Sequence, residues 1–350
     1  MTKILTCTFF LLITCPGELP AQVLFRVMSY NVENLFDTSD NPLKADNEYL
    51  PSGSRHWTKG RYYHKLQQIA KVISAAGEWD TPAVIGLCEV ENDSVMLHLL
   101  HRTPLKHQHY RYCMTHGEDA RGINVALLYQ RDQFGYLGHT EYPVRFTRNR
   151  HKQTRNILHV WGKLITGHIL DLFVCHFPSR YGGEKESEQD RFDAAGTVRL
   201  LCDSLRSVRQ EARILIMGDF NDTPDDPSIR EKLAASPFVY PCPPGKETQL
   251  FNLFSDPRLL NLSGSHKYQG EWSQLDQLIL TGNLLKPDAP IRYKPRSARI
   301  FNPSFLLTKD KTWLGVRPRR TYYGFKYEAG YSDHLPLITD FLLYLPNHNE

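Results

Sequence analysis

Residues 214–222 read Ile-Leu-Ile-Met-Gly-Asp-Phe-Asn-Asp, a short apolar run that ends at a glycine followed by polar residues. An apolar run of this length, bounded by turn-forming residues, is typical of a buried strand. Residues 331–336 read Tyr-Ser-Asp-His-Leu-Pro and place an aspartate and a histidine directly before another apolar segment. Both stretches predict that carboxylate, amide and imidazole groups lie where buried strands meet their loops.

Strands and helices alternate along the rest of the chain. Eight segments have the length and the Val, Ile, Leu or aromatic enrichment of strands, namely residues 23–30, 83–89, 124–129, 157–164, 169–176, 213–219, 275–280 and 335–343. Residues 62–75 and 188–208 repeat apolar side chains at helical spacing. The pattern predicts an α/β (α+β) fold, a four-layer sandwich in which helices cover two central mixed β-sheets.

Residues 1–21 have the three parts of a signal peptide. Lys3 supplies the positive charge, residues 4–14 form the apolar part, and residues 19–21 read Leu-Pro-Ala, a small-residue cleavage site. The apolar part is shorter than the roughly 20 residues that a membrane-spanning helix needs. We therefore expect an exported protein.

The remainder is expected to be a single domain over residues 22–350 that is periplasmic or secreted and monomeric. A lipoprotein anchor at Cys15 is the weaker alternative. No other segment is long and apolar enough to cross a membrane. A composition of 41% hydrophobic and 23% charged residues excludes a disordered chain, and a net charge of +4 is too small to indicate a polyanionic partner by itself.

The cysteines indicate neither a disulfide scaffold nor a redox centre. Five of the seven follow residue 21, and an odd number argues against a complete disulfide framework. Cys88 and Cys175 lie in strand-like runs and are interpreted as small buried hydrophobic residues, while one disulfide among the others stays open. No Cys-x-x-Cys pair occurs, so zinc and redox motifs have no support.

Polar side chains gather at the predicted strand ends. They come from six separate segments and are Asn31, Glu33, Glu89, His176, Asp219, Asn221, Asp276, Asp333 and His334. A rigid sheet commonly presents its chemistry on the loops at one edge, so we expect these side chains to share a site. Oxygen-rich sites of this kind suit a hard cation such as Mg²⁺ and metal-assisted phosphoryl chemistry, and two imidazoles and an amide remain for the phosphate and the nucleophile.

In this order, the same residues resemble the endonuclease/exonuclease/phosphatase superfamily, which includes deoxyribonuclease I, repair exonucleases, sphingomyelinases and inositol polyphosphate phosphatases. The resemblance spans residues 26–342 and implies a deoxyribonuclease I-like fold. Residues 121–129, 176–183 and 270–277 are similar to a bacterial branch of the superfamily that is often exported. Asn124 departs from that branch, where an aspartate is expected, so no charged role is carried over to this position.

The resemblance implies a metal site. Glu89 would be the principal Mg²⁺ ligand, helped by Asn31 and by Asp333 or Glu33. The cation would neutralise charge that develops on the phosphate and the leaving oxygen. Mn²⁺ and Ca²⁺ are alternatives to Mg²⁺ at a site made of oxygen ligands.

The resemblance also implies how protons move. His334 would activate water as the general base, and Asp276 would orient its ring and stabilise the imidazolium, with Asp333 as the alternative orienting group. Asp219 would position the nucleophile or protonate the leaving group. No covalent intermediate is required.

Three further residues would bind the substrate phosphate. Asn221 and His176 would donate hydrogen bonds to its non-bridging oxygens, and Arg180 would contact it as a cation.

Each of these residues is also compatible with a structural role. Residues 219–224 suit an Asx-rich turn before a helix, and His176 suits a satisfied core histidine. Arg180 suits a surface charge. The histidines outside the predicted site are interpreted as solvated loop or helix residues.

Residues 281–330, called the basic insert below, bear on the substrate. Eleven cationic side chains lie here against three acidic ones, and they are Lys286, Arg292, Lys294, Arg296, Arg299, Lys309, Lys311, Arg317, Arg319, Arg320 and Lys326. Eight aromatic residues interleave with them. This composition suits a surface that follows a nucleic-acid backbone and stacks on bases, but it equally suits aromatics that pack a long loop onto the domain. A second basic stretch, residues 145–155, adds modest support for a polyanion.

The sequence therefore predicts an exported, Mg²⁺-dependent phosphodiester hydrolase, with a nuclease acting on DNA or RNA as the first candidate. A phospholipase C or sphingomyelinase-type enzyme, or a phosphomonoesterase, is the alternative because one catalytic set serves all of these substrates. A non-catalytic binding protein is the distant alternative.

Overall fold

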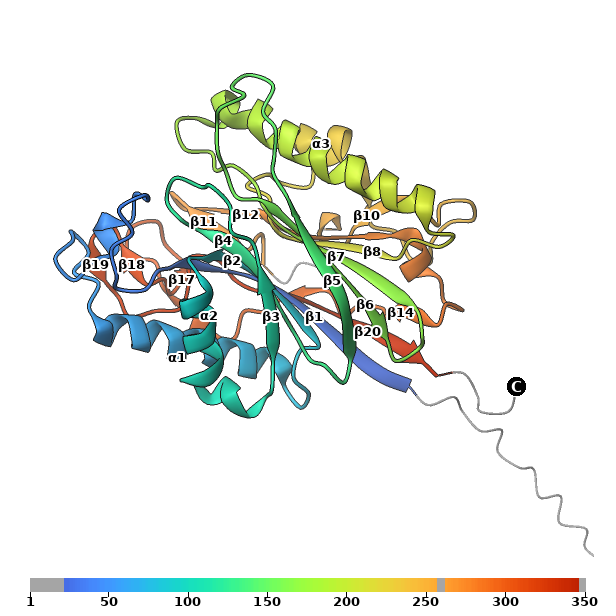
Figure 1. The fold of residues 1–350 in the computed structure, drawn as a ribbon, viewed down its shortest axis with the longest axis horizontal. Helices are drawn as coiled ribbons and strands as arrows, with labels where there is room; N and C mark the ends of the chain where they lie inside the picture. Colours follow the sequence, from blue (N-terminus) through green and yellow to red (C-terminus); the bar gives the residue numbers. More distant parts are fainter. Residues whose placement is uncertain (1–21, 257–261, 346–350) are drawn as a thin grey trace, which may run out of the picture.

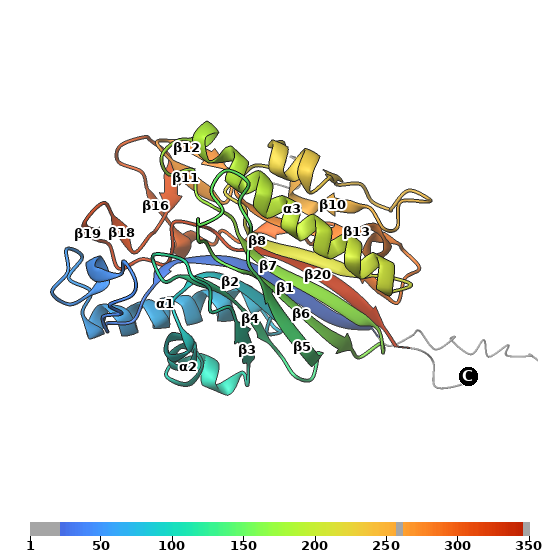
Figure 2. The same cartoon turned by 45° about the horizontal axis from the view of Figure 1, so that its top comes forward.

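Two seven-stranded β-sheets lie face to face in the computed structural model, which describes residues 22–256 and 262–345. Helices α1 (Lys59–Gly77) and α2 (Asp93–His101) cover the outer face of one sheet (Figure 1). Helix α3 (Glu184–Val208) covers the outer face of the other (Figure 2). This arrangement confirms the predicted four-layer sandwich.

The first sheet has the strand order β14-β20-β1-β2-β4-β3, with β15 paired to β20. Its strands are β1 (Gln22–Leu35), β2 (Val84–Val90), β3 (Arg111–Met114), β4 (Asn124–Tyr129), β14 (Ile291–Tyr293), β15 (Arg299–Ile300) and β20 (Leu337–Tyr344). Strands β1 and β2 are parallel, and the other pairs are antiparallel. Strands β2 and β4 are buried almost throughout because the helices cover one face and the second sheet covers the other.

The second sheet has the order β5-β6-β7-β8-β13-β10-β9. Its strands are β5 (Phe134–Tyr142), β6 (Ile157–Leu164), β7 (Ile169–His176), β8 (Ile214–Asp219), β9 (Ala235–Pro237), β10 (Leu250–Asn252) and β13 (Asp276–Thr281). Strands β7 and β8 are parallel, and β13 is antiparallel to β8. Both sheets are therefore mixed, as predicted.

The helices are held by apolar faces and by capping side chains. In α1 the side chains of Leu66, Ile69 and Ile73 are fully buried, and the hydroxyl of Thr58 accepts a hydrogen bond from the first turn. Residue Asn92 caps α2 in the same way, although α2 was not predicted. Short 3-10 and π helices are η1 (Asn47–Tyr49), η2 (Pro104–His107), η3 (Ser228–Lys232), η4 (Leu253–Ser255), η6 (Gly282–Leu285) and η7 (Ser304–Leu306).

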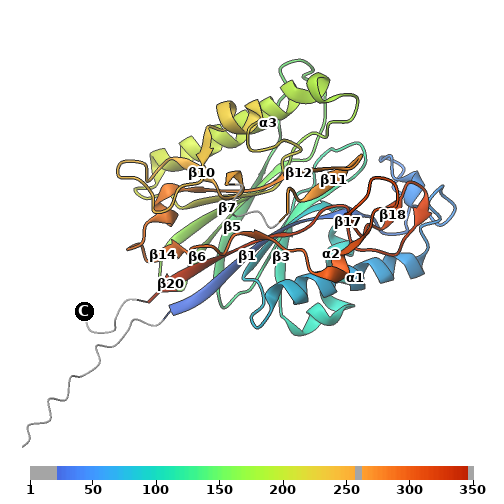
Figure 3. The same cartoon turned by 180° about the vertical axis from the view of Figure 1, so that it is seen from behind.

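The basic insert is folded into short strands. Besides β14 and β15, it contains β16 (Leu307–Lys309), β17 (Val316–Pro318), β18 (Tyr322–Tyr323) and β19 (Lys326–Tyr327), and β17 contacts β11 (His266–Tyr268) of the hairpin that β11 forms with β12 (Glu271–Ser273). The β18–β19 hairpin lies beside the start of α1 (Figure 3). At least one aromatic ring of the basic insert, that of Tyr327, therefore packs the insert onto the domain. This packing is one of the two alternatives that the sequence left open.

Three further expectations concern the cysteines, membrane-spanning helices and the signal peptide. All five cysteines of the described residues carry free thiols, and Cys88 and Cys175 are fully buried, as predicted. No helix within residues 22–256 and 262–345 has the length and hydrophobicity needed to cross a membrane. The predicted signal peptide (residues 1–21) lies outside the described part of the chain.

The backbone at Gly218 generates the first prediction. Gly218 has a φ of +137°, and a Cβ added there would lie 1.9 Å from the carbonyl oxygen of Cys175 in the neighbouring strand. We expect Gly218→Ala to lower the free energy of unfolding by about 3 kcal/mol or more, because the methyl group overlaps rigid backbone and the torsion angle suits only glycine.

The matched control is Gly182→Ala. Gly182 also has a positive φ, +86°, but no atom lies within 4 Å of a Cβ added there. This variant should lose only about 1–2 kcal/mol, from torsional strain. Equal losses of the two variants in urea unfolding would contradict the interpretation of Gly218.

Candidate active site

Three predicted residues lie side by side across the second sheet. His176 ends β7 and is the register partner of Asp219, which ends β8. Asp219 is also the register partner of Asp276, the first residue of β13. Because β13 runs antiparallel to β7 and β8, its beginning meets their ends, and all three residues share one edge of the sheet.

The first sheet contributes residues to the same edge. Asn31 lies in β1, Glu89 lies in β2, and His334 lies just before β20. Strand β1 pairs in parallel with β2 and antiparallel with β20, so these three positions come together. The hydroxyl of Ser332 donates a 2.7 Å hydrogen bond to the carbonyl oxygen of Asn31 and fixes the loop before β20.

The carboxylate of Asp219 joins the two sheets. Its Oδ2 accepts a 3.0 Å hydrogen bond from Nδ2 of Asn31. The same oxygen lies 3.6 Å from Nε2 of His176 and 3.7 Å from Nε2 of His334. Asp219 is only 2% exposed, so one shielded oxygen faces both imidazoles that the sequence predicted.

His334 and Asp276 form a buried pair. Nδ1 of His334 lies 2.7 Å from Oδ2 of Asp276, which also accepts a hydrogen bond from the hydroxyl of Ser265. Burial by itself lowers the pKa of His334, but the carboxylates of Asp276 and Asp219 outweigh it and hold that pKa well above its usual range. The pair confirms that Asp276, and not Asp333, contacts the ring of His334 through Nδ1.

The pKa values of Asp219 and His176 are both shifted in the direction that favours the uncharged form. Burial raises the pKa of Asp219 to about 7, against the attraction of His334. Burial and the nearby cations Arg155 and Arg121 lower the pKa of His176 well below its usual range. At neutral pH, His176 is therefore a neutral hydrogen-bonding group, and Asp219 can hold or release a proton.

The turn after β8 is the Asx turn that the sequence suggested, and the contact of Asn221 with phosphate stays a prediction. The backbone N–H of Asn221 donates a 2.9 Å hydrogen bond to Oδ1 of Asp219, which is an Asx turn, and Asn221 has a φ of +51°. Its Nδ2 donates to the carbonyl oxygen of Phe177 at 3.0 Å. Asp219 thus shapes the turn with one oxygen and faces the imidazoles with the other.

Arg180 is paired with carboxylates that do not belong to this cluster. Its guanidinium pairs with Asp222, Asp226 and Glu184 and donates a 2.7 Å hydrogen bond to the carbonyl oxygen of Asn221. With these acceptors, Arg180 braces the Asn221 turn, and its predicted contact with substrate phosphate is not favoured by the arrangement. The sequence could not reveal this because the three carboxylates come from a helix and a separate loop.

Glu89 fits a divalent cation. Its Oε2 accepts a 2.7 Å hydrogen bond from the backbone of Asn34, whereas its Oε1 accepts none within the described residues. That oxygen lies 3.7 Å from Nη2 of Arg121 and 3.8 Å from Nε2 of His176. A partly buried carboxylate with one open oxygen is the ligand type that Mg²⁺ requires. Asn31, the second predicted ligand, pairs with Cys88 beside Glu89; its Nδ2 donates to Asp219 and its Oδ1 accepts a 3.0 Å hydrogen bond from the backbone of Glu33.

Glu33 and Asp333 do not fit the predicted role of metal ligands as well. Oε1 of Glu33 lies 3.3 Å from Nε of Arg320, and its Oε2 accepts a hydrogen bond from the backbone of Thr321. Oδ2 of Asp333 accepts a 2.6 Å hydrogen bond from Nη2 of the same arginine. Lys65, buried in α1, lies 3.8 Å from Glu33. Protein cations therefore balance both carboxylates, and metal binding by them stays a prediction that this geometry does not favour.

Sequence reasoning missed His266. Its ring lies against that of His334, with the centroids 4.6 Å apart, and its Nε2 lies 4.0 Å from Oδ2 of Asp333. Burial lowers the pKa of His266 to about 4, so it stays neutral beside His334. The expectation of solvated histidines outside the site was wrong here and at His159, which is 5% exposed. Neither histidine has a neighbouring motif that distinguishes it.

Asn124 has a structural role that an aspartate would not fill. Its Oδ1 accepts a 2.9 Å hydrogen bond from the backbone of Gly117, and its Nδ2 donates a 2.9 Å hydrogen bond to the carbonyl oxygen of Glu91. The amide therefore ties the loop before β4 to the end of β2.

Comparison with known proteins places the chain in a broad group. The sequence matches the Endonuclease/Exonuclease/phosphatase family over residues 26–342. It matches none of the curated proteins with which it was compared.

Several solved structures share the fold. An endonuclease/exonuclease/phosphatase family protein from Bacteroides thetaiotaomicron is 12% identical with a TM-score of 0.55, and the match covers 95% of this chain and 99% of that one. A mannosyl-6-phosphatase from the same organism is 15% identical with a TM-score of 0.55, over 91% and 99% of the two chains. A truncated TDP2 from Caenorhabditis elegans is 14% identical with a TM-score of 0.51, over 91% and 97%. At identities of 12% to 15%, the similarity to these structures shows a shared fold and no more.

The pair of His334 and Asp276 can be tested against a second buried pair. We expect His334→Gln to lower kcat by roughly 100- to 10,000-fold on any phosphoester that the wild type hydrolyses, because the predicted general base is lost while the volume is nearly kept.

The control is His159→Gln. Nε2 of His159 lies 2.9 Å from Oδ1 of Asp171 in a buried contact. Asp171 pairs with Ile214 at the beginning of β8, whereas Asp219 lies at the end of that strand. This variant should lose about 1–3 kcal/mol of unfolding free energy and keep its kcat. If His334→Gln retained near-wild-type kcat, or if both variants lost it equally, the assignment of His334 would be wrong.

Proposed function

Because the chain belongs to the endonuclease/exonuclease/phosphatase family, we propose that it is an exported, Mg²⁺-dependent phosphodiester hydrolase that cleaves nucleic acid. The observation that carries the hydrolytic part is the shielded oxygen of Asp219 within 3.7 Å of both imidazoles. Such a cluster can move a proton toward or away from a phosphate oxygen without a nucleophilic side chain.

His334 acts as the general base in this proposal. Asp276 holds Nδ1 of the ring, and Nε2 takes a proton from water in those molecules whose ring is neutral. Because the carboxylates hold the pKa of His334 well above its usual range, this neutral fraction grows as the pH rises, and the rate should rise with it. The carboxylate also stabilises the imidazolium that results. The neutral ring of His266 lies against His334 and adds no competing charge.

Asp219 and His176 act on the phosphate side, and Asn221 offers the phosphate the second N–H of an amide whose first N–H is bonded to the carbonyl oxygen of Phe177. With a pKa raised to about 7, Asp219 can give a proton to the leaving oxygen at neutral pH. The buried Nδ1 of His176 has no hydrogen-bond partner among the described residues. The other ring nitrogen, Nε2, faces Oδ2 of Asp219 and the open oxygen of Glu89, so it is the atom that can donate a hydrogen bond to a phosphate oxygen bound beside them.

The metal site of the proposal is centred on the open oxygen of Glu89, with Asn31 beside it. When bound there, Mg²⁺ neutralises charge on the phosphate and the leaving oxygen. Mn²⁺ and Ca²⁺ accept the same oxygen ligands. Arg121, 3.7 Å from Glu89, is a further cation near this position that the sequence did not suggest.

Nucleic acid remains the first substrate candidate because two exposed aromatic side chains of the basic insert, Trp313 and Tyr323, line the same cavity as Asp333. The charges support it less than the sequence suggested. Within the insert, Lys294, Arg299, Arg317 and Arg320 face carboxylates of the protein. Without an extended basic surface the argument for a polyanion is weaker, and a small phosphomonoester, which needs no such surface, is the second candidate.

Export is the remaining part of the proposal. It rests on the sequence of residues 1–21, with Lys3 before the apolar residues 4–14. Five free thiols are compatible with any compartment, so they do not bear on it.

A substrate panel tests the proposal. Purified protein with Mg²⁺ should cleave plasmid DNA or RNA, and EDTA should stop the reaction. If both nucleic acids stayed intact while phosphate was released from a sugar phosphate, the phosphomonoesterase would replace the nuclease. If phosphocholine was released from a lipid, the phospholipase-type alternative would replace it. Inactivity on every substrate would favour a binding protein.

Glu89→Gln tests the metal site in the same assay. We expect the Mg²⁺ concentration for half-maximal rate to rise by at least about tenfold, because loss of a direct ligand costs no less than loss of a supporting group. Glu91→Gln is the matched control. Burial raises the pKa of Glu91 to about 8, so this carboxyl group is mostly uncharged at pH 7, and it already accepts a hydrogen bond from the backbone of Asp37. The control variant should keep the wild-type Mg²⁺ titration. An unchanged Mg²⁺ titration for Glu89→Gln would contradict the assignment.

A further inference from the structure

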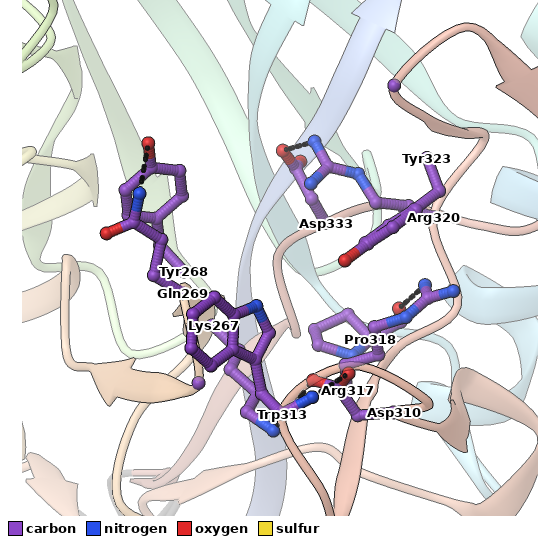
Figure 4. Close-up of a pocket in the computed structure, with 12 residues that line it drawn as sticks. Lys267, Tyr268, Gln269, Asp310, Trp313, Arg317, Pro318, Arg320, Tyr323 and Asp333 are labelled. Atoms are coloured by element: carbon purple, nitrogen blue, oxygen red, sulfur yellow. Dashed lines mark hydrogen bonds and ion pairs between the residues drawn. The ribbon is translucent and has the colours of Figure 1, made fainter.

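A cavity of about 230 Å³ opens beside the Asp333–His334 loop. Asp333 and Arg320 line one end of it, and the β11–β12 hairpin and the basic insert line the rest (Figure 4). Asp333 directly precedes the proposed base His334, so the cavity adjoins the loop that carries the base. Below it is called the side cavity.

Aromatic side chains stand on two sides of the side cavity. Trp313 and Tyr268 lie on one side, and Tyr323 lies with Arg320 on the other (Figure 4). Trp313 is 51% exposed, Tyr268 is 66% exposed and Tyr323 is 38% exposed. Exposed rings on opposite walls leave their faces or edges open to a flat ligand.

The wall that carries Trp313 is held in place before any ligand binds. The carboxylate of Asp310 accepts a 3.0 Å hydrogen bond from the backbone N–H of Trp313 and a 2.9 Å hydrogen bond from Nζ of Lys267. A Cβ added at Gly270 would lie 3.1 Å from Trp313, so the indole packs directly on that glycine. Fixing a ring in this way reduces the entropy that binding costs.

The opposite wall is braced by a second ion pair. Arg317 makes two 2.8 Å hydrogen bonds to the carboxylate of Glu328, and its guanidinium lies 4.4 Å from the ring centre of Tyr323. The guanidinium of Arg317 is therefore paired with Glu328 and also makes a cation–π contact with the ring of Tyr323.

The charges disfavour an anion as the occupant of the side cavity. Lys267 is paired with Asp310, Arg317 with Glu328, and Arg320 with Asp333. Each cation of the lining thus has a carboxylate partner, and the cavity offers rings and amides instead of unbalanced positive charge. A phosphate or a lipid headgroup phosphate gains little here, whereas an uncharged flat ring with polar edges gains stacking contacts.

We infer that the side cavity binds one unpaired nucleobase of the substrate next to the scissile phosphate. The inference rests on the proposed nuclease function and deepens it. A base that is paired in a duplex cannot enter a cavity of this size without leaving its stack, so single-stranded nucleic acid is the preferred substrate. The aromatic residues of the basic insert then bind the nucleobase, while the residues around Asp219 carry out the hydrolysis.

The test compares two single-stranded oligonucleotides with the same phosphates. One carries its bases, and the other carries tetrahydrofuran abasic sugars throughout. The readout is the ratio of kcat/KM for the base-containing strand to that for the abasic strand. We expect a ratio of at least about fivefold for the wild type, the lower end of the effect of one base–aromatic stack.

Variants of Trp313 locate the effect. Trp313→Ala should bring the ratio close to one, whereas Trp313→Phe, which keeps a ring, should retain most of it. Trp79→Ala is the matched control, because Trp79 is 99% exposed and follows the end of α1. It should keep the wild-type ratio, and thermal unfolding should show that all three variants are folded.

The outcomes separate the inference from the proposed function. If the wild type cleaves both strands with a ratio near one, or if Trp313→Ala keeps the wild-type ratio, the nuclease stands and the base site is wrong. If duplex DNA is cleaved faster than the base-containing single strand, the base site is also wrong. If neither strand nor duplex is cleaved, the nuclease proposal falls and the inference falls with it.

Discussion

The buried carboxylate of Asp219 is the group on which the rest of the site depends. Its Oδ2 accepts a hydrogen bond from Asn31 of the opposite sheet and faces the rings of His176 and His334, while its Oδ1 fixes the turn at Asn221. A charge here is costly because water is excluded, which is why burial raises the pKa of Asp219 to about 7. The two sheets thus meet at a carboxyl group that can take up and release a proton.

The remaining charges fall into two sets with separate duties. Asp219, Asp276 and the two imidazoles form one set at the ends of the central strands. Glu33 and Asp333 form another set with the cations Lys65 and Arg320. Arg320 belongs to the basic insert, so this second set anchors the insert beside His334. The side cavity therefore gains its position from the same ion pairs that neutralise two predicted metal ligands.

The sequence predicted the fold well because both sheets are buried on two faces. Strands covered in this way are continuous apolar runs, and residues 124–129, 157–164 and 169–176 were predicted with the bounds that the structure has. Strand β5 was missed because it is an edge strand with mostly exposed residues, and α2 was missed because its nine residues give a weak periodic signal.

The site was predicted as far as local patterns reach. Residues at strand ends, such as His176 and Asp219, were found because the apolar run before them marks the position. The partners of Arg180 and Glu33 were not found, since ion pairs between distant segments leave no local pattern. His266 was missed for the same reason, and its contact with His334 arises only because β11 folds back against the loop before β20.

The central claim is that Asp219 and His334 work as one unit, and a double-mutant cycle tests it most directly. The kcat values of Asp219→Asn, His334→Gln and the double variant would be measured on bis(para-nitrophenyl) phosphate with saturating Mg²⁺. The account predicts that the double variant is at most about tenfold slower than the slower single variant, because removal of either group disables the same step. Losses that multiply in full would show that the two groups act independently and would contradict the account.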